Sequence, residues 1–156
     1  MWVVAVGLGV SCAGPTVAAS AGAAEAGPVL AAGDLTLTLD ALVAGPRRPD
    51  DPKAGAPCLA TMRIGNRSTA WVRTFAMRLL VHDPQGVVVR RVSVLAMPLP
   101  PGKTTMATFP VLDTGCAGVG SLTILDFPQC ADGAGRGMRC RTAAIPDSRV
   151  TVPLTF

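Results

Sequence analysis

The sequence predicts an all-β protein, an antiparallel β-sandwich of about seven strands that disulfides stabilise. Three observations support this prediction. Short apolar runs alternate with polar residues at the two-residue period of a half-buried strand, and turn residues separate the runs. No run keeps a helical period between helix caps. Four cysteines lie beyond the N-terminal 26 residues, which is typical of an exported domain of this size.

The first 26 residues differ from the rest of the 156-residue chain. They contain no basic residue, an apolar stretch at 2–10, and small residues that end in "AEA" at 24–26. This pattern predicts a secretory signal peptide, 1–26, cleaved to leave 27–156 as a single β-sandwich domain. In an alternative reading, "GVSC" is a bacterial lipoprotein signal and Cys12 carries a lipid anchor. The apolar stretch is too short for a permanent membrane-spanning helix, so we expect no transmembrane segment after cleavage.

The first two predicted strands are separated by a polar loop. Residues 34–43 place leucines on one side and threonines on the other, and residues 58–66 place Cys58 with the apolar set. The loop at 45–57 holds four prolines and is the longest stretch without a strand pattern. Such loops often carry binding residues, so we expect a contact surface there.

The third and fourth predicted strands, 71–83 and 87–97, flank the only histidine. The turn "DPQG" joins them, since Pro84 fixes φ and Gly86 permits unusual φ. His82 is then expected on the outward face at a hairpin corner. A catalytic histidine needs a partner and a nearby reacting group, which such a corner does not offer. We therefore expect no catalytic residue here and no enzyme activity.

The last three predicted strands cover 103–112, 119–127 and 149–156. The last one aligns alternate residues from Val150 to Phe156 on one side. Pro153 within it indicates an edge strand, because proline cannot donate to a ladder. Seven short strands in about 120 residues favour an immunoglobulin-like sandwich.

Four cysteines remain after the expected cleavage, and we expect them to form two structural disulfides. Four cysteines allow three connectivities. Cys130 and Cys140 bracket a short Gly-rich loop, so their pairing is the simplest, and it leaves Cys58 with Cys116. Zinc and redox sites use closely spaced cysteines such as C-x-x-C, which this chain lacks. We expect no metal site and no cofactor.

The charge pattern favours an anionic neighbour without indicating nucleic acid. The formal charge is +4 and rises to +5 when Glu25 is lost with the signal. The basic residues are scattered and aromatic residues do not interleave with them, so a platform for nucleic acid is not expected. The candidate binding surface combines the basic residues of the 45–57 and 131–141 loops, in which guanidinium groups and Gly-rich backbone suit an anion. These residues are Arg47, Arg48, Lys53, Arg136, Arg139 and Arg141.

The run from "CLATMRIGN" at 58–66, through "LLVHDPQGVVVRRV" at 79–92, to "PLPPGKTTMATF" at 98–109 resembles small bacterial exported immunoglobulin-like domains of the FxLYD type. The resemblance covers about residues 58–112. It implies export and a role in binding or envelope assembly, and it carries over no catalytic residue.

These observations together predict an exported, non-catalytic binding or accessory module of the bacterial cell envelope, periplasmic or secreted. Its expected partner is another envelope protein or an anionic envelope component. An alternative is a periplasmic copper carrier, because five methionines follow the signal and thioethers bind Cu(I). A lipid-anchored envelope protein is the other alternative.

Overall fold

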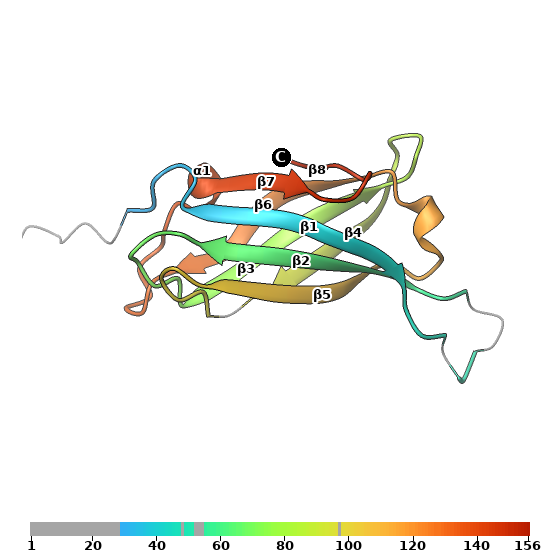
Figure 1. The fold of residues 1–156 in the computed structure, drawn as a ribbon, viewed down its shortest axis with the longest axis horizontal. Helices are drawn as coiled ribbons and strands as arrows, with labels where there is room; N and C mark the ends of the chain where they lie inside the picture. The colour runs from blue at the N-terminus through green and yellow to red at the C-terminus, as the bar shows by residue number, and fades with distance from the viewer. Residues whose placement is uncertain (1–28, 48, 52–54, 97) are drawn as a thin grey trace, which may run out of the picture.

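The computed structural model describes residues 29–47, 49–51, 55–96 and 98–156. Over these residues the chain forms two stacked four-stranded sheets, with strand orders β5-β2-β1-β7 and β4-β3-β6-β8 (Figure 1). This arrangement confirms the predicted all-β sandwich. The strands are β1 (Leu35–Ala44), β2 (Cys58–Asn66), β3 (Thr74–His82), β4 (Val88–Leu95), β5 (Thr104–Leu112), β6 (Ser121–Ala131), β7 (Ala144–Ser148) and β8 (Leu154–Thr155).

Helical structure in the described residues is limited to two short segments. A 3-10 turn, η1 (Cys116–Gly118), precedes β6, and one turn of helix, α1 (Cys140–Ala143), precedes β7. In the described part of the chain, no helix has the length and apolar character needed to cross a bilayer. The expected signal peptide and the alternative anchor at Cys12 lie outside the described residues.

The core lies between the sheets and uses the alternation seen in the sequence. The inward residues of β2, of β3 and of β1 as far as Leu39 are fully buried, and most of those facing them from the other strands are buried as well. Burying a large aliphatic or aromatic side chain contributes about 1.5–3 kcal/mol, so this layer supplies most of the driving force for folding. Its largest members include Leu35, Leu37, Leu39, Met62, Ile64, Phe75, Met77, Leu79, Leu122 and Ile124.

The C-terminal part of the fold differs from the prediction. The expected strand at 149–156 is reduced to the two residues of β8, and β7 forms at a stretch where no strand was expected. The hydroxyl of Ser148 donates to the carbonyl oxygens of Val150 and Val152, at 3.1 and 2.6 Å, and so turns the chain out of the first sheet. Leu154 is buried as expected, but Phe156 is exposed.

Both C-terminal strands pair in parallel, so the sandwich is not purely antiparallel. β7 lies beside β1, and β8 lies beside β6. β8 is an edge strand, as the proline that precedes it predicted. Residues 149–153 carry the chain from one sheet to the other, at the side of the sandwich where β7 and β8 lie near each other (Figure 1).

The hairpin between β3 and β4 has the predicted corner. Gly86 has a φ of +83°, and the Asp83 carboxylate accepts hydrogen bonds from the backbone N–H groups of Gln85 and Val87, at 2.9 and 2.8 Å. His82 is half-buried, and its Nδ1 lies 3.2 Å from the carbonyl oxygen of Gly86. Its Nε2 is shielded from solvent and has no hydrogen-bond partner among the residues that the structure describes. His82 therefore ends a strand and supports a turn.

Two disulfides connect the described cysteines in the pairs that the loop argument favoured. Cys58 on β2 is joined to Cys116 of η1, and Cys130 on β6 is joined to Cys140 of α1. Cys58 is fully buried with the apolar face of β2. Disulfides of this kind are typical of an oxidising, extracytoplasmic location.

Asn66, at the end of β2, is a buried polar residue that fixes the next loop. Its exposed fraction is 1%. Its Nδ2 donates to the carbonyl oxygens of Ala70 and Leu99, at 2.8 and 2.9 Å, and its Oδ1 accepts from the N–H and hydroxyl of Ser68. Although "NRS" is a glycosylation triplet, the amide nitrogen of Asn66 is committed to these bonds in the folded protein.

Candidate functional site: a basic hollow on one sheet

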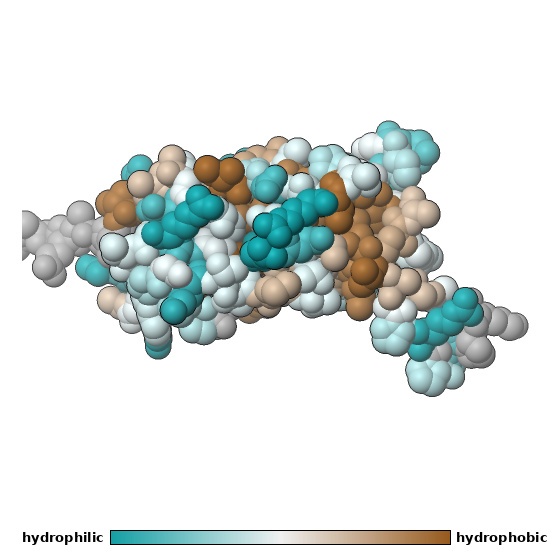
Figure 2. Space-filling view, in the orientation of Figure 1, coloured by the Kyte–Doolittle hydropathy of each residue, from teal (hydrophilic) through white to brown (hydrophobic). Residues whose placement is uncertain are grey.

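The outer face of the β5-β2-β1-β7 sheet is polar. In each strand, every second side chain points away from the core, and these outward side chains are mostly polar. Thr38 of β1 lies directly opposite Arg63 of β2 on one side and Asp147 of β7 on the other. Figure 2 shows hydrophilic side chains gathered across the middle of this face, with a hydrophobic patch toward the 45–57 loop. The face therefore presents hydroxyl and charged groups on a rigid sheet.

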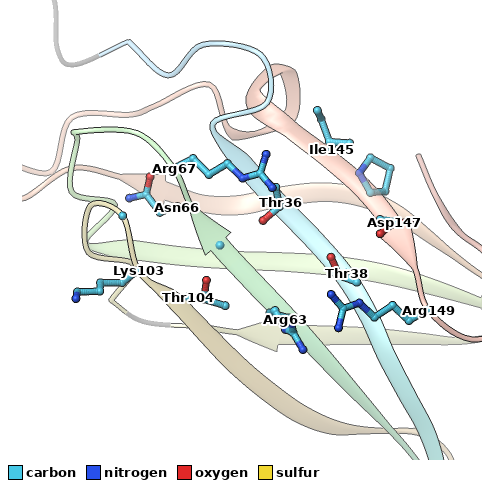
Figure 3. A pocket seen from close by; sticks show the side chains of 13 residues that line it. Thr36, Thr38, Arg63, Asn66, Arg67, Lys103, Thr104, Ile145, Asp147 and Arg149 are labelled. Carbon is cyan, nitrogen blue, oxygen red and sulfur yellow. The ribbon is translucent and has the colours of Figure 1, made fainter.

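A hollow of about 540 Å³ opens on this face (Figure 3). We call it the basic hollow. Its lining combines threonine hydroxyls with four cationic side chains and one acidic side chain. The lining residues are Thr36, Thr38, Arg63, Gly65, Asn66, Arg67, Gly102, Lys103, Thr104, Ile145, Pro146, Asp147 and Arg149.

Gly65 makes room for the floor of the hollow. It lies opposite Thr36 of β1 and Thr104 of β5. A Cβ at this position would lie 2.5 Å from the Thr36 hydroxyl oxygen and 3.4 Å from that of Thr104. The missing side chain thus leaves two hydroxyl groups facing a shared space.

The charges of the hollow fall into two groups. Toward one end, Arg63 and Arg149 both approach the mostly buried carboxylate of Asp40, with N–O distances of 2.8 and 3.5 Å. At the other end, Arg67 and Lys103 are exposed and, among the residues that the structure describes, form no ion pair. In Figure 3 the threonines lie between these two groups. Arg67 and Lys103 therefore have charge available for an anionic group.

The structure places the predicted binding loops at opposite ends of the sandwich (Figure 1). The 45–57 loop follows β1, at the end where Cys58 and Cys116 are joined, whereas the 131–141 loop follows β6 at the other end. Arg47 is exposed in the first loop, and Arg48 and Lys53 lie outside the described residues. The two loops do not form one surface.

Within the 131–141 loop, the backbone N–H groups and the Arg136 guanidinium that were expected to bind an outside anion already bind the carboxylate of Asp132. The Asp132 Oδ1 accepts the backbone N–H groups of Ala134 and Arg136, both at 2.9 Å, and Arg136 Nε donates to Oδ2 at 2.8 Å. The hydrogen bond from the Arg136 backbone is the main cause that lowers the pKa of Asp132. Asp132 is buried, so this carboxylate is part of the loop structure.

The other two arginines of this loop border a smaller hollow of about 260 Å³. Arg141 donates to the carbonyl oxygen of Leu125 at 2.8 Å and lies over the ring of Phe156, 5.1 Å from its centroid. Arg139 is exposed at the rim. Phe127 lines the same hollow, and its ring lies between those of Phe75 and Phe156, with centroid separations of 5.6 and 6.5 Å.

Acid is expected to weaken the fold through Asp132. Because its pKa is lower in the folded protein than in the unfolded chain, its stabilising contribution is present above the unfolded value, about 3.9, and is lost as the pH falls through the folded value. Urea unfolding between about pH 5 and pH 2 should show a steeper loss for the wild type than for Asp132→Asn, by at most about one proton per molecule. Asp50→Asn, in the other loop, is the charge-matched control, and an equal slope in all three proteins would contradict the assignment.

Metal-binding side chains are not gathered in the described residues. No group of three or more His, Cys, Asp or Glu is placed there to hold an ion. Of the methionines behind the copper alternative, Met62 and Met77 are fully buried in the core and Met106 is exposed on β5. Met97 lies outside the described residues. Met62 and Met77 therefore have a packing role.

The basic hollow could not be predicted from the sequence, although part of its signal was visible. The outward positions of residues 34–43 and 58–66 held threonines and Arg63, which marked a polar face. Arg149 and Lys103 belong to segments far away in the chain, and only the strand order brings them to that face.

Comparison with known proteins adds one structural likeness. No family model matches the chain, and no curated protein matches it. The solved structure of IrmA from Escherichia coli is similar, with a TM-score of 0.55 and 12% sequence identity, over 72% of this chain and 89% of that one. These comparisons do not identify an FxLYD-type domain. At this level of identity the likeness shows the fold alone, a β-sandwich domain.

Proposed function

We propose that this protein is an exported, non-catalytic binding module of the bacterial cell envelope, and that the basic hollow takes an anionic saccharide of that envelope. The observation that carries this proposal is the basic hollow itself. It combines cations that are free to pair with an outside anion and hydroxyl groups on a rigid sheet. The two disulfides support an extracytoplasmic setting.

The chemistry of the lining selects the ligand class. Guanidinium groups form paired, charge-assisted hydrogen bonds with carboxylate or phosphate oxygens, and Lys103 adds a point charge. The hydroxyls of Thr36, Thr38 and Thr104 accept and donate, as sugar hydroxyls do. A saccharide with carboxylate or phosphate groups matches both halves of this lining.

Binding of a galacturonic acid hexamer, followed by calorimetry, tests the proposal. The purified material should be recovered from the envelope fraction, where a chain beginning at Gly27 is expected. Replacing Arg67 and Lys103 by Gln should weaken binding at least about tenfold, because each charged hydrogen bond contributes about 1.5–3 kcal/mol. Higher salt should weaken it further.

The matched control is the pair Arg47→Gln and Arg139→Gln, which removes the same charge from exposed positions outside the hollow. It should change affinity less than about twofold, since screening limits distant charges. An equal loss in both double variants, or equal binding of neutral maltohexaose, would refute the assignment of the hollow.

A further inference from the structure

The edges of the two sheets are not protected alike. The described residues place four strands at sheet edges: β5 and β7 in one sheet, β4 and β8 in the other. Pro110 lies in β5, Pro146 lies in β7, and Pro153 directly precedes β8. Proline at an edge blocks the addition of another strand, because it has no N–H to donate. β4 is the edge strand without this protection.

The free edge of β4 can be assigned residue by residue. The N–H of Ala96 donates to the carbonyl oxygen of Phe75 on β3, at 3.2 Å, and the pairing from Val81 to Ala76 has no bulge. Alternate residues of an antiparallel strand bond to opposite sides. The backbone groups of Arg91, Ser93 and Leu95 therefore point away from β3, toward the open edge.

The side chains of β4 also leave this edge accessible. On the inward side, Val92 and Val94 are buried, and Arg90 pairs with Asp113 across an N–O distance of 2.8 Å. On the outward side, Val89 and Leu95 are exposed by 47% and 64%. Exposed aliphatic residues along an unprotected edge are a feature of strand-addition sites.

We propose that β4 is a docking edge for an extended segment of another protein, which adds as a fifth strand to the β4-β3-β6-β8 sheet. The outward positions of β4 read aliphatic, basic, polar, aliphatic at Val89, Arg91, Ser93 and Leu95. Cross-strand neighbours are favourable when charges are opposite and aliphatic residues meet. The complementary segment has aliphatic residues toward its ends and acidic residues between them.

Charge argues against the other occupants of this edge. A second copy of β4 would bring Arg91 of each copy onto the same face of one short ladder, where like charges repel, whereas Arg90 is already paired with Asp113. Residues 1–28 contain only one acidic residue, Glu25, and so do not supply the acidic pattern. The docking edge is independent of the basic hollow, which lies on the other sheet.

A designed peptide tests the docking edge directly. The probe is Val-Thr-Glu-Thr-Glu-Thr-Val, blocked at both ends, whose alternate residues suit either strand direction, and the second probe has Lys in place of Glu. The purified, oxidised protein is titrated with each peptide while its backbone amides are followed by NMR. The Glu peptide should bind with a Kd below about 1 mM, shift the amides of Arg91, Ser93 and Leu95, and slow their exchange with solvent.

Two proline variants separate docking from folding. Ser93→Pro removes an edge-facing N–H without touching the bonds to β3, and it should weaken peptide binding at least about tenfold while the protein stays folded. Met106→Pro makes the same change on β5. There the N–H of Asn66 donates to the carbonyl oxygen of Lys103, so the backbone groups of the even-numbered residues of β5 point away from β2, toward the open edge. It should leave binding unchanged.

Several results would overturn the proposal. They are no binding of the Glu peptide at about 1 mM, equal binding of the Lys peptide, and equal losses in both proline variants. Self-association that Ser93→Pro abolishes would instead assign the edge to a second copy of the chain.

Discussion

Removing the disulfide between Cys58 and Cys116 should destabilise the protein by about 4 kcal/mol. The bond joins residues 58 positions apart, and in the chain-entropy model a loop of that length loses this much unfolded-state entropy. Cys58 is also fully buried, so alanine there leaves a small cavity that adds to the loss. The measurement is urea unfolding of the double variant Cys58→Ala, Cys116→Ala.

The second disulfide is the internal control for this prediction. Cys130 and Cys140 are 10 positions apart, which corresponds to about 3 kcal/mol. The variant Cys130→Ala, Cys140→Ala should therefore unfold at a higher urea concentration than the first variant. If removal of the short link were the more damaging change, loop length would not be what sets the difference in stability between the two variants.

Replacing Asn66 by Ala should destabilise the fold by about 3 kcal/mol. The substitution removes two donors and an acceptor from a buried site, and each polar group left without its partner loses about 1–3 kcal/mol. The carbonyl oxygen of Leu99 keeps its bond from the Val72 N–H, and that of Ala70 keeps one from the Ser68 hydroxyl, which limits the loss. Thermal unfolding followed by circular dichroism measures it.

Two further variants show whether the amide donors cause the effect. Asn66→Asp keeps the shape and the acceptor for Ser68 but turns an oxygen toward two carbonyl oxygens, so it should be at least as harmful at neutral pH. Ser68→Ala keeps Asn66 and should lose about 1 kcal/mol. A loss below about 1 kcal/mol for both Asn66 variants would show that the loop does not depend on this side chain.

The strands that the sequence predicted well are those in which packing and pattern agree. Residues 34–43 and 58–66 alternate because one side faces the core, and their inward members are fully buried except Ala41, which follows a register shift after Leu39. The disulfide pairs followed from loop length together with the apolar facing of Cys58. Both arguments use only local information, which the sequence contains.

The parts that were not predicted depend on contacts between distant segments. β7 contains Pro146 and Asp147, which give it a poor strand pattern, and it forms because β1 offers a free edge beside it. Residues 150–152 have a good strand pattern, but the Ser148 hydroxyl turns them into a crossing between sheets. Tertiary context overrides local propensity in both places.

The candidate site was less predictable than the fold for the same reason. Counting basic residues in loops led to Arg47 and Arg136, but Arg136 pairs with Asp132, and the two loops lie at opposite ends of the sandwich. The cations of the basic hollow come from three segments, at β2, before β5 and after β7, that the strand order gathers. Sequence spacing does not contain that order.

The parallel pairs made by β7 and β8 affect when the protein can fold. These last strands pair with β1 and β6 and occupy one edge of each sheet, so neither sheet is whole until they are present. A chain that emerges N-terminus first, from a ribosome or from a translocation channel, must therefore release every residue up to β8 before both sheets are complete. Because the sandwich closes late, the polypeptide stays unfolded enough to pass through a narrow channel until that point.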